Sequence, residues 1–162
     1  MNLRRDTTAK IEIAAKMYDS MNHLKKNVVG QYAKAIFAIQ KEINKVAGEV
    51  SAGQVCEKCK GGCCKDGVED AIEIEELLYA MFAMTEEERK KVYEVVNAEH
   101  EPGKCSLADK DGCVLPKYAR PIPCKAFHCN SIPGGGDIMG NQGKELKKAY
   151  AHYVKMVDAM EV

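Results

Sequence analysis

The sequence predicts a mainly α-helical protein with one irregular, cysteine-rich segment, and three observations support this fold class. Apolar residues recur at helical spacing over the first fifty residues, over 73–99 and near the C-terminus. All five prolines lie within 101–143, and all eight cysteines lie between Cys56 and Cys129. We therefore expect a helical bundle that carries an irregular lobe with one short β-hairpin.

The first fifty residues predict N-terminal helices. Thr7 and Thr8 are candidate caps for a first helical face, which is formed by Ile11, Ala14, Ala15 and Tyr18. A second face follows in Val28, Tyr32, Ala35, Ile36, Ile39, Ile43 and Val46. Gly30 either interrupts this stretch or only weakens it. Two antiparallel helices and one long bent helix both fit the pattern.

Two further helices are predicted within the cysteine-containing region. Residues 73–84 have an apolar face made of Ile74, Leu77, Leu78, Met81 and Phe82. Thr85 and Glu88 then have the spacing of a capping box, which predicts a new helix from Thr85 to about Glu99. The C-terminal helix is predicted from an amphipathic pattern in Leu146, Ala149, Tyr150, Tyr153, Val154, Val157 and Met160.

Residues 101–143 are rich in turn-forming residues. Asp111-Gly112 lies between Leu107 and Val114 and predicts a small hairpin. A connection of this length is unusual in a compact domain unless something ties it down. With 162 residues and 46% hydrophobic composition, we expect a single domain over 1–162. Its parts would be N-terminal helices over 1–50, a cysteine-cluster region with two intervening helices over 51–135, and a C-terminal helix over 136–162.

Composition argues against several classes of function. Lys+Arg and Asp+Glu are equal at 24 each, so the chain has no broad positive field for a nucleic-acid backbone. No apolar run approaches the length that crosses a bilayer. Residues 1–10 are polar, and no apolar signal-peptide core follows them, so we expect the cytoplasm, where thiols stay reduced.

The eight cysteines indicate a metal-binding lobe. One or two cysteines could be small core hydrophobes, but eight within one segment could not. Disulfides would require an oxidising compartment, which the N-terminal sequence does not indicate. The remaining interpretation is thiolate ligation, for which we predict two groups of ligands: Cys56, Cys59, Cys63 and Cys64, and Cys105, Cys113, Cys124 and Cys129.

The surroundings of the cysteines favour ligation, but they do not identify the metal. The stretches 56–66 and 104–129 hold eight cations against four acids: Lys58, Lys60, Lys65, Lys104, Lys110, Lys117, Arg120 and Lys125 against Glu57, Asp66, Asp109 and Asp111. Nearby cations lower thiol pKa values and offset thiolate charge. Neither group matches a zinc finger, because no histidine pair follows at finger spacing.

Three functions remain open. Adjacent Cys63-Cys64 and the uneven spacings favour an iron–sulfur cluster, such as 4Fe-4S, with an electron-transfer or redox role. Eight thiolates also suffice for two closed zinc sites in a structural scaffold or interaction module. The third possibility is a metalloenzyme with an open metal position. We expect a metal ion or cluster and a redox or protein partner that the sequence does not identify, with no nucleic acid and no membrane.

The cysteine pattern resembles the YkgJ-like, or CxxCxxCC, family of zinc- or iron-chelating domains. The resemblance covers Cys56 to Cys129 and depends on the eight cysteines, the Cys63-Cys64 pair and Arg120-Pro121 before Cys124. It implies a metal or iron–sulfur site, with no settled reaction. Three residues separate Cys59 from Cys63 where the family has two, which implies the same ligands with altered loop geometry.

Other candidate residues are weaker. His128 adjoins Cys129, and neighbouring residues seldom point at the same ion. His23 and His152 fall within predicted helices and are expected to be structural or solvated. Arg120 is expected to donate hydrogen bonds to loop carbonyl groups rather than to sulfur.

Overall fold

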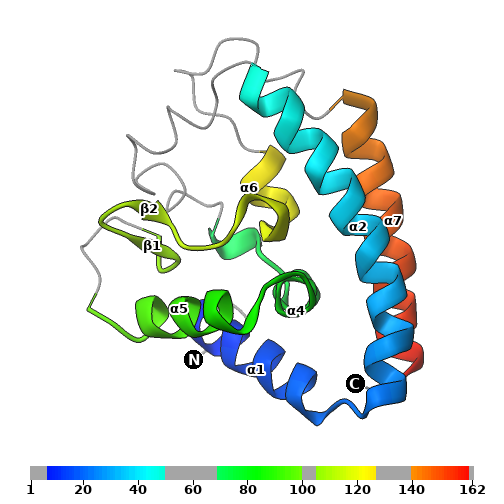
Figure 1. The fold of residues 1–162 in the computed structure, drawn as a ribbon, viewed down its shortest axis with the longest axis horizontal. Helices are drawn as coiled ribbons and strands as arrows, with labels where there is room; N and C mark the ends of the chain where they lie inside the picture. Colours follow the sequence, from blue (N-terminus) through cyan, green and yellow to red (C-terminus); the bar gives the residue numbers. More distant parts are fainter. Residues whose placement is uncertain (1–6, 50–68, 100–104, 127–139, 161–162) are drawn as a thin grey trace.

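The computed structural model describes residues 7–49, 69–99, 105–126 and 140–160 (Figure 1). The elements in chain order are α1 (Thr7–Ser20), α2 (His23–Glu49), η2 (Glu69–Ala71), α4 (Ile74–Ala83), α5 (Glu86–Val96), β1 (Ala108–Asp109), β2 (Gly112–Cys113), η3 (Lys117–Ala119), α6 (Ile122–Ala126) and α7 (Gly140–Ala159). Helices dominate this part of the chain and the strands form one small antiparallel pair, so the predicted mainly α class is confirmed. None of the helices within the described ranges is long and apolar enough to cross a membrane.

The two N-terminal helices separate at Met21 and Asn22, and Gly30 lies inside α2. Asn22 caps the start of α2, because its Oδ1 accepts the backbone N–H of Lys25 at 2.8 Å. A side-chain acceptor at this position satisfies one of the unpaired donors in the first turn of α2. The helices then diverge: α1 packs against α4, and α2 packs against α7 (Figure 1).

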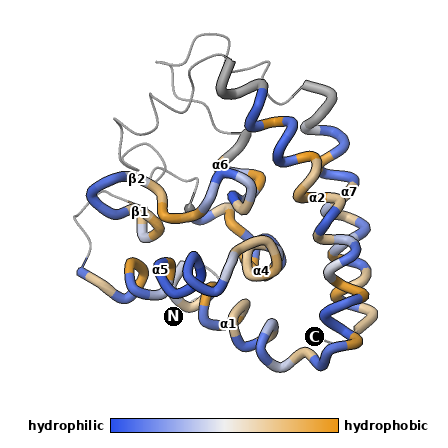
Figure 2. Tube along the Cα trace, viewed as in Figure 1, coloured by the Kyte–Doolittle hydropathy of each residue, from blue (hydrophilic) through white to orange (hydrophobic). Residues whose placement is uncertain are grey.

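Helix α4 is the centre of the core. Its residues from Glu76 to Met81 are all buried, and it contacts α1, α2, α7 and η3. A helix that is apolar on most of its circumference is stable only when other elements surround it. Figure 2 shows the contrast with α2 and α7, where hydrophilic and hydrophobic residues alternate along the helix. The predicted helix over 73–84 is thus present and is the most deeply buried element described.

The predicted capping box at the start of α5 is present. The Thr85 Oγ1 accepts the Glu88 N–H at 3.2 Å, and the Glu88 Oε2 accepts the Thr85 N–H at 2.8 Å. The box satisfies two backbone donors at once and stops α4 and α5 from merging. Arg89 closes the end of α4 by donating from one Nη to the carbonyl oxygens of Met81 and Met84.

The predicted amphipathic face of the C-terminal helix also forms. Helix α7 buries Leu146, Tyr150, Tyr153 and Val157 against the bundle. Tyr79, Tyr150 and Tyr153 form a three-membered aromatic cluster in which every pair of rings is edge-to-face, with centroids 5.6 to 6.4 Å apart. Such pairs add stabilisation beyond their buried area, so this cluster joins α4 firmly to α7.

Lys10 is an unusual member of the core. Only 3% of its surface is exposed, and its ammonium group donates to the carbonyl oxygens of Ile72 at 2.5 Å and Asp70 at 3.4 Å. A buried ammonium group is tolerated only when its hydrogen atoms have acceptors. Lys10 therefore fixes α1 to the short segment that leads from η2 into α4.

Candidate metal centre

Three of the eight predicted ligands fall within the described residues. Cys105 is buried immediately before the hairpin, Cys113 is half-buried in β2, and Cys124 is half-buried in α6. The hairpin and α6 lie on the same side of α4 (Figure 1). The other five predicted ligands, Cys56, Cys59, Cys63, Cys64 and Cys129, lie outside the described residues.

The predicted hairpin is present, and two backbone N–H groups at its start contact Cys105. Ala108 pairs with Cys113, and Asp109 pairs with Gly112. Just before β1, the Leu107 N–H donates to the Cys105 Sγ at 3.5 Å. Hydrogen bonds from backbone N–H groups to sulfur stabilise the thiolate form and tune the potential of a cluster that the sulfur ligates.

The hairpin turn is fixed by local chemistry. Gly112 has φ of 118°, a conformation that side-chain-bearing residues rarely adopt. The Asp109 Oδ1 accepts the Asp111 N–H at 2.8 Å, which closes the turn from within. Asp109 also makes an ion pair with Lys91 of α5 at 3.5 Å, so the hairpin lies against that helix.

Three buried side chains of the bundle hold the backbone that leads into α6. The Tyr79 hydroxyl donates to the Tyr118 carbonyl oxygen at 2.5 Å, and the Gln40 Nε2 donates to the Arg120 carbonyl oxygen at 2.7 Å. The Ile122 N–H donates to the Glu76 Oε1 at 2.8 Å. The partners are up to 80 residues apart in the sequence. Together these contacts fix residues 118–122, a segment that ends two residues before Cys124.

Glu76 is a residue of α4, and its buried carboxylate contacts the start of α6. Burial raises its pKa, while hydrogen bonds from the N–H groups of Glu73 and Ile122 act in the opposite direction. Prolines at 121 and 123 suit the first turn of α6, where a missing N–H removes no intrahelical bond. Of the first-turn donors that the prolines leave, that of Ile122 is satisfied by Glu76, so this carboxylate positions the helix that carries Cys124.

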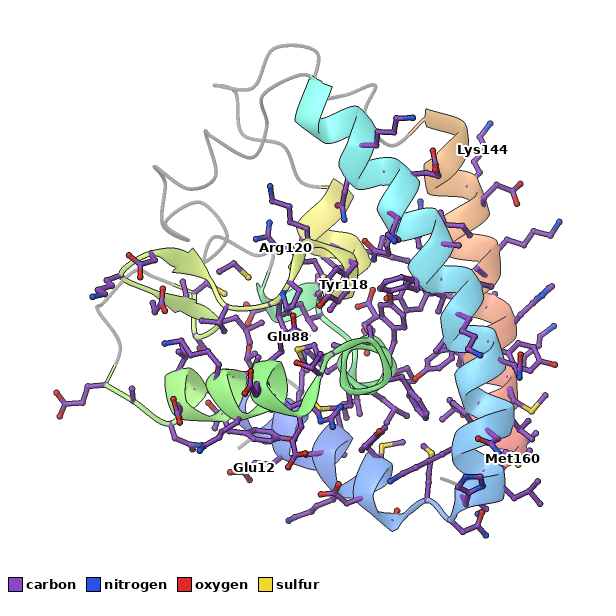
Figure 3. The ribbon with its side chains drawn as sticks, in the orientation of Figure 1. Glu12, Glu88, Tyr118, Arg120, Lys144 and Met160 are labelled. Carbon is purple, nitrogen blue, oxygen red and sulfur yellow. The ribbon has the colours of Figure 1, made fainter. Side chains whose placement is uncertain are left out.

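A second polar link joins η3 to α5. The Tyr118 hydroxyl donates to the Glu88 Oε1 at 2.5 Å, and Figure 3 shows Glu88, Tyr118 and Arg120 near one another between α5 and α6. Burial and the Glu88 carboxylate raise the pKa of Tyr118 to about 12. Burial would raise the pKa of Glu88, but hydrogen bonds from Tyr118 and Thr85 outweigh it and lower the value.

Arg120 and the two histidines of the described helices behave as expected. The Arg120 Nε donates to the Leu115 carbonyl oxygen at 3.2 Å, which stabilises the turn between β2 and η3. His23 and His152 are exposed on α2 and α7. His128 lies outside the described residues.

The described cysteines can be compared with the ligands that a thiolate-bound metal requires. Soft thiolates suit zinc and iron–sulfur clusters, and each such site takes about four ligands. Within 7–49, 69–99, 105–126 and 140–160, no three Cys, His, Asp or Glu side chains converge on a common point. Cys105, Cys113 and Cys124 have the right chemistry, so a complete site would need cysteines from the rest of the chain.

The sequence did not reveal the residues that support this lobe. Gln40, Glu76 and Tyr79 carry no motif, and Glu76 is one of two adjacent glutamates at the start of a helix, a position typical of exposed acids. Its role depends on the Ile122 N–H, a donor 46 residues away. No local pattern could identify it.

Comparison of the chain with protein-family models, with curated proteins and with solved structures finds no match. The resemblance to the YkgJ-like family therefore stays a prediction that depends on the cysteine pattern.

Proposed function

We propose that this protein binds metal through its cysteine thiolates, most favourably as an iron–sulfur cluster with an electron-transfer or redox role. The observation that carries the proposal is the confinement of all eight cysteines to Cys56–Cys129, in a chain with no cysteine elsewhere. Thiolates select zinc, copper(I) and iron–sulfur clusters. The proposal places the protein in the cytoplasm, where a reducing environment keeps such ligands available.

The described part of the lobe supports this proposal in two ways. The Cys105 sulfur accepts a backbone N–H, an interaction that favours the charged thiolate. The approach to Cys124 is held by Tyr79, Gln40 and Glu76 from the rigid bundle. Ligands on a supported backbone are held in position before the metal binds, which raises affinity.

A bound cluster would supply one-electron chemistry, and the chain would supply its ligands and surroundings. Cys105, Cys113 and Cys124 are the described residues that would hold it. The buried faces of Leu107 and Leu115 would limit water around the sulfurs on the bundle side. Restricting water near thiolates changes the reduction potential of the group that they bind.

The test is anaerobic purification followed by iron, acid-labile sulfide and zinc analysis. We expect stoichiometric iron and sulfide and a broad absorption near about 400 nm, typical of cluster charge transfer. A colourless preparation with two zinc ions would instead favour the structural zinc scaffold. Four disulfides without metal, in protein purified anaerobically, would overturn both interpretations.

Variants separate ligation from general destabilisation. Cys113→Ser and Cys124→Ser should each lower bound iron, because serine is a poor ligand for these metals. Val114→Ala is the matched control, since Val114 is half-buried beside Cys113 and has no sulfur. Equal iron content in Cys113→Ser, Cys124→Ser and Val114→Ala would exclude both cysteines as ligands.

A further inference from the structure

A cavity of about 380 Å³ lies between α2 and the last turn of α4. This volume falls in the range of small-molecule sites, roughly 300–1,000 Å³. Its lining combines small and aromatic residues with lysine and amide side chains. Among the described residues, none of the proposed metal ligands, Cys105, Cys113 and Cys124, lines this cavity.

The two aromatic walls of this cavity are held in place by other rings. Phe82 meets Tyr18 edge-to-face at a centroid distance of 5.0 Å, and Phe37 meets Tyr118 in the same way at 5.1 Å. Both walls are thus fixed by neighbours outside the cavity. A planar apolar group would find a preformed surface and would lose little affinity to side-chain ordering.

The charge of the cavity is positive. Lys26 and Lys34 line it, and no carboxylate lines it among the described residues. Neither lysine makes an ion pair within this part of the chain, although the Lys26 ammonium lies 4.3 Å from the Tyr18 ring centroid. The two lysines are eight residues apart on α2, which separates them by about 12 Å along the helix axis.

The other lysines of α2 add to the positive charge near the cavity. Between Lys25 and Lys45 the helix has five lysines and one acid, Glu42. The chain as a whole is neutral, so this surface is locally cationic. Gln31, an exposed residue of α2, adds an amide donor at the cavity. A ligand with an anionic group is the one that this lining favours.

Gly30 is the remaining unusual feature of the lining. It lies inside α2, where glycine is about 1 kcal/mol less favourable than alanine. Packing does not require it, because an added Cβ would lie 3.8 Å from the nearest Phe82 ring atom, an ordinary contact. Alanine would therefore fit at this position, and only a longer side chain would displace Phe82 or extend into the cavity.

We propose that this cavity binds a small organic anion with a planar apolar body. The body would lie between Phe37 and Phe82, and the anionic group would reach Lys26 or Lys34, with Gln31 as a further donor. The proposal does not rest on the proposed metal, because its argument uses no cysteine of the described residues.

Nuclear magnetic resonance titration of the protein tests this inference. The probes are 2-naphthoate, the neutral 2-naphthamide and the cationic 2-naphthylmethylammonium, which share one ring system. We expect saturable binding of 2-naphthoate, with shifts concentrated on the Gly30 amide and its neighbours, and at least fivefold weaker binding of the other two. Equal affinity for the three probes would refute the charge argument.

Variants complete the test. Lys26→Gln combined with Lys34→Gln should weaken 2-naphthoate binding up to about fivefold, because the carboxylate pairs with one of these lysines and an exposed ion pair contributes up to about fivefold. Lys147→Gln, an exposed lysine on α7, is the matched control and should leave binding unchanged. Gly30→Leu should abolish binding in a protein whose helical circular dichroism is retained. Unchanged affinity in the double lysine variant, or no saturable binding at all, would overturn the proposal.

Discussion

Replacing Tyr79 by phenylalanine removes one buried hydroxyl and leaves the aromatic ring in place. That hydroxyl donates to the Tyr118 carbonyl oxygen at 2.5 Å, and Tyr79 is completely buried. The variant loses the hydrogen bond and leaves a carbonyl acceptor unpaired near the core, which together cost about 1–3 kcal/mol. We expect a loss of about 2 kcal/mol in the free energy of unfolding.

Tyr153 provides a matched control in the same aromatic cluster. It is also completely buried, and its hydroxyl has no hydrogen-bond partner among the described residues. Tyr153→Phe removes an unpaired polar atom without removing an interaction. This variant should therefore leave stability unchanged or increase it by up to about 1 kcal/mol.

The assay is urea unfolding of the two variants and the parent protein under reducing, anaerobic conditions. With a denaturant slope of about 1–3 kcal/mol per molar, a loss of 2 kcal/mol lowers the midpoint by about 1 M. Amide exchange at Ala119 and Ile122 should also accelerate in Tyr79→Phe, because the hydroxyl holds this backbone segment. If Tyr153→Phe loses as much stability as Tyr79→Phe, hydrogen bonding does not distinguish the two hydroxyls and the reasoning is wrong.

Three further predictions concern the caps, the buried acid and the metal. Thr85→Ala should lower the free energy of unfolding by about 1 kcal/mol through loss of the capping box, and a change below about 0.3 kcal/mol would contradict this. Burial raises the folded-state pKa of Glu76. The stability that this raised pKa adds is therefore complete below the unfolded pKa of about 4.3, and it is lost as pH rises through the folded-state pKa. The stability of the parent relative to Glu76→Gln should therefore increase as pH falls from the raised folded-state pKa towards about 4.3, by at most about 1.4 kcal/mol per pH unit, and a flat difference over this range would contradict the assignment. Metal removal under reducing conditions should accelerate amide exchange at Val114 while Ile122 keeps the hydrogen bond to Glu76, and equal acceleration at both would show that the bundle does not support the lobe.

Local patterns predicted the elements whose causes are local. The capping box depends on Thr85 and Glu88, three residues apart, and the hairpin depends on a turn that Gly112 permits. Both could be identified because the interacting groups are neighbours in sequence. The break at Asn22 was less visible, since an asparagine cap and a glycine such as Gly30 are both plausible interruptions.

The contacts that support the candidate centre could not be predicted in this way. The sequence indicated which cysteines are candidate ligands, but not that Gln40 and Glu76 would turn inward to hold the backbone before Cys124. A buried amide or carboxylate is stable only if the fold supplies partners, and these partners are backbone groups of a distant segment. The 3₁₀ turns and the five-residue α6 were also missed, because such short elements take their shape from what they pack against.

The burial of Lys10 makes it a chemical reporter of how firmly α1 is docked. Amine-acylating reagents attack only accessible, uncharged amino groups, and in the folded protein Lys10 is enclosed with its hydrogens directed at Ile72 and Asp70. Lys16 lies on the same helix and is exposed, so it provides an internal reference. The ratio of acylation at these two lysines, measured by mass spectrometry, follows the fraction of time that α1 is detached from α4. One peptide digest could thus measure local opening of this helix without a variant or a fluorescent label.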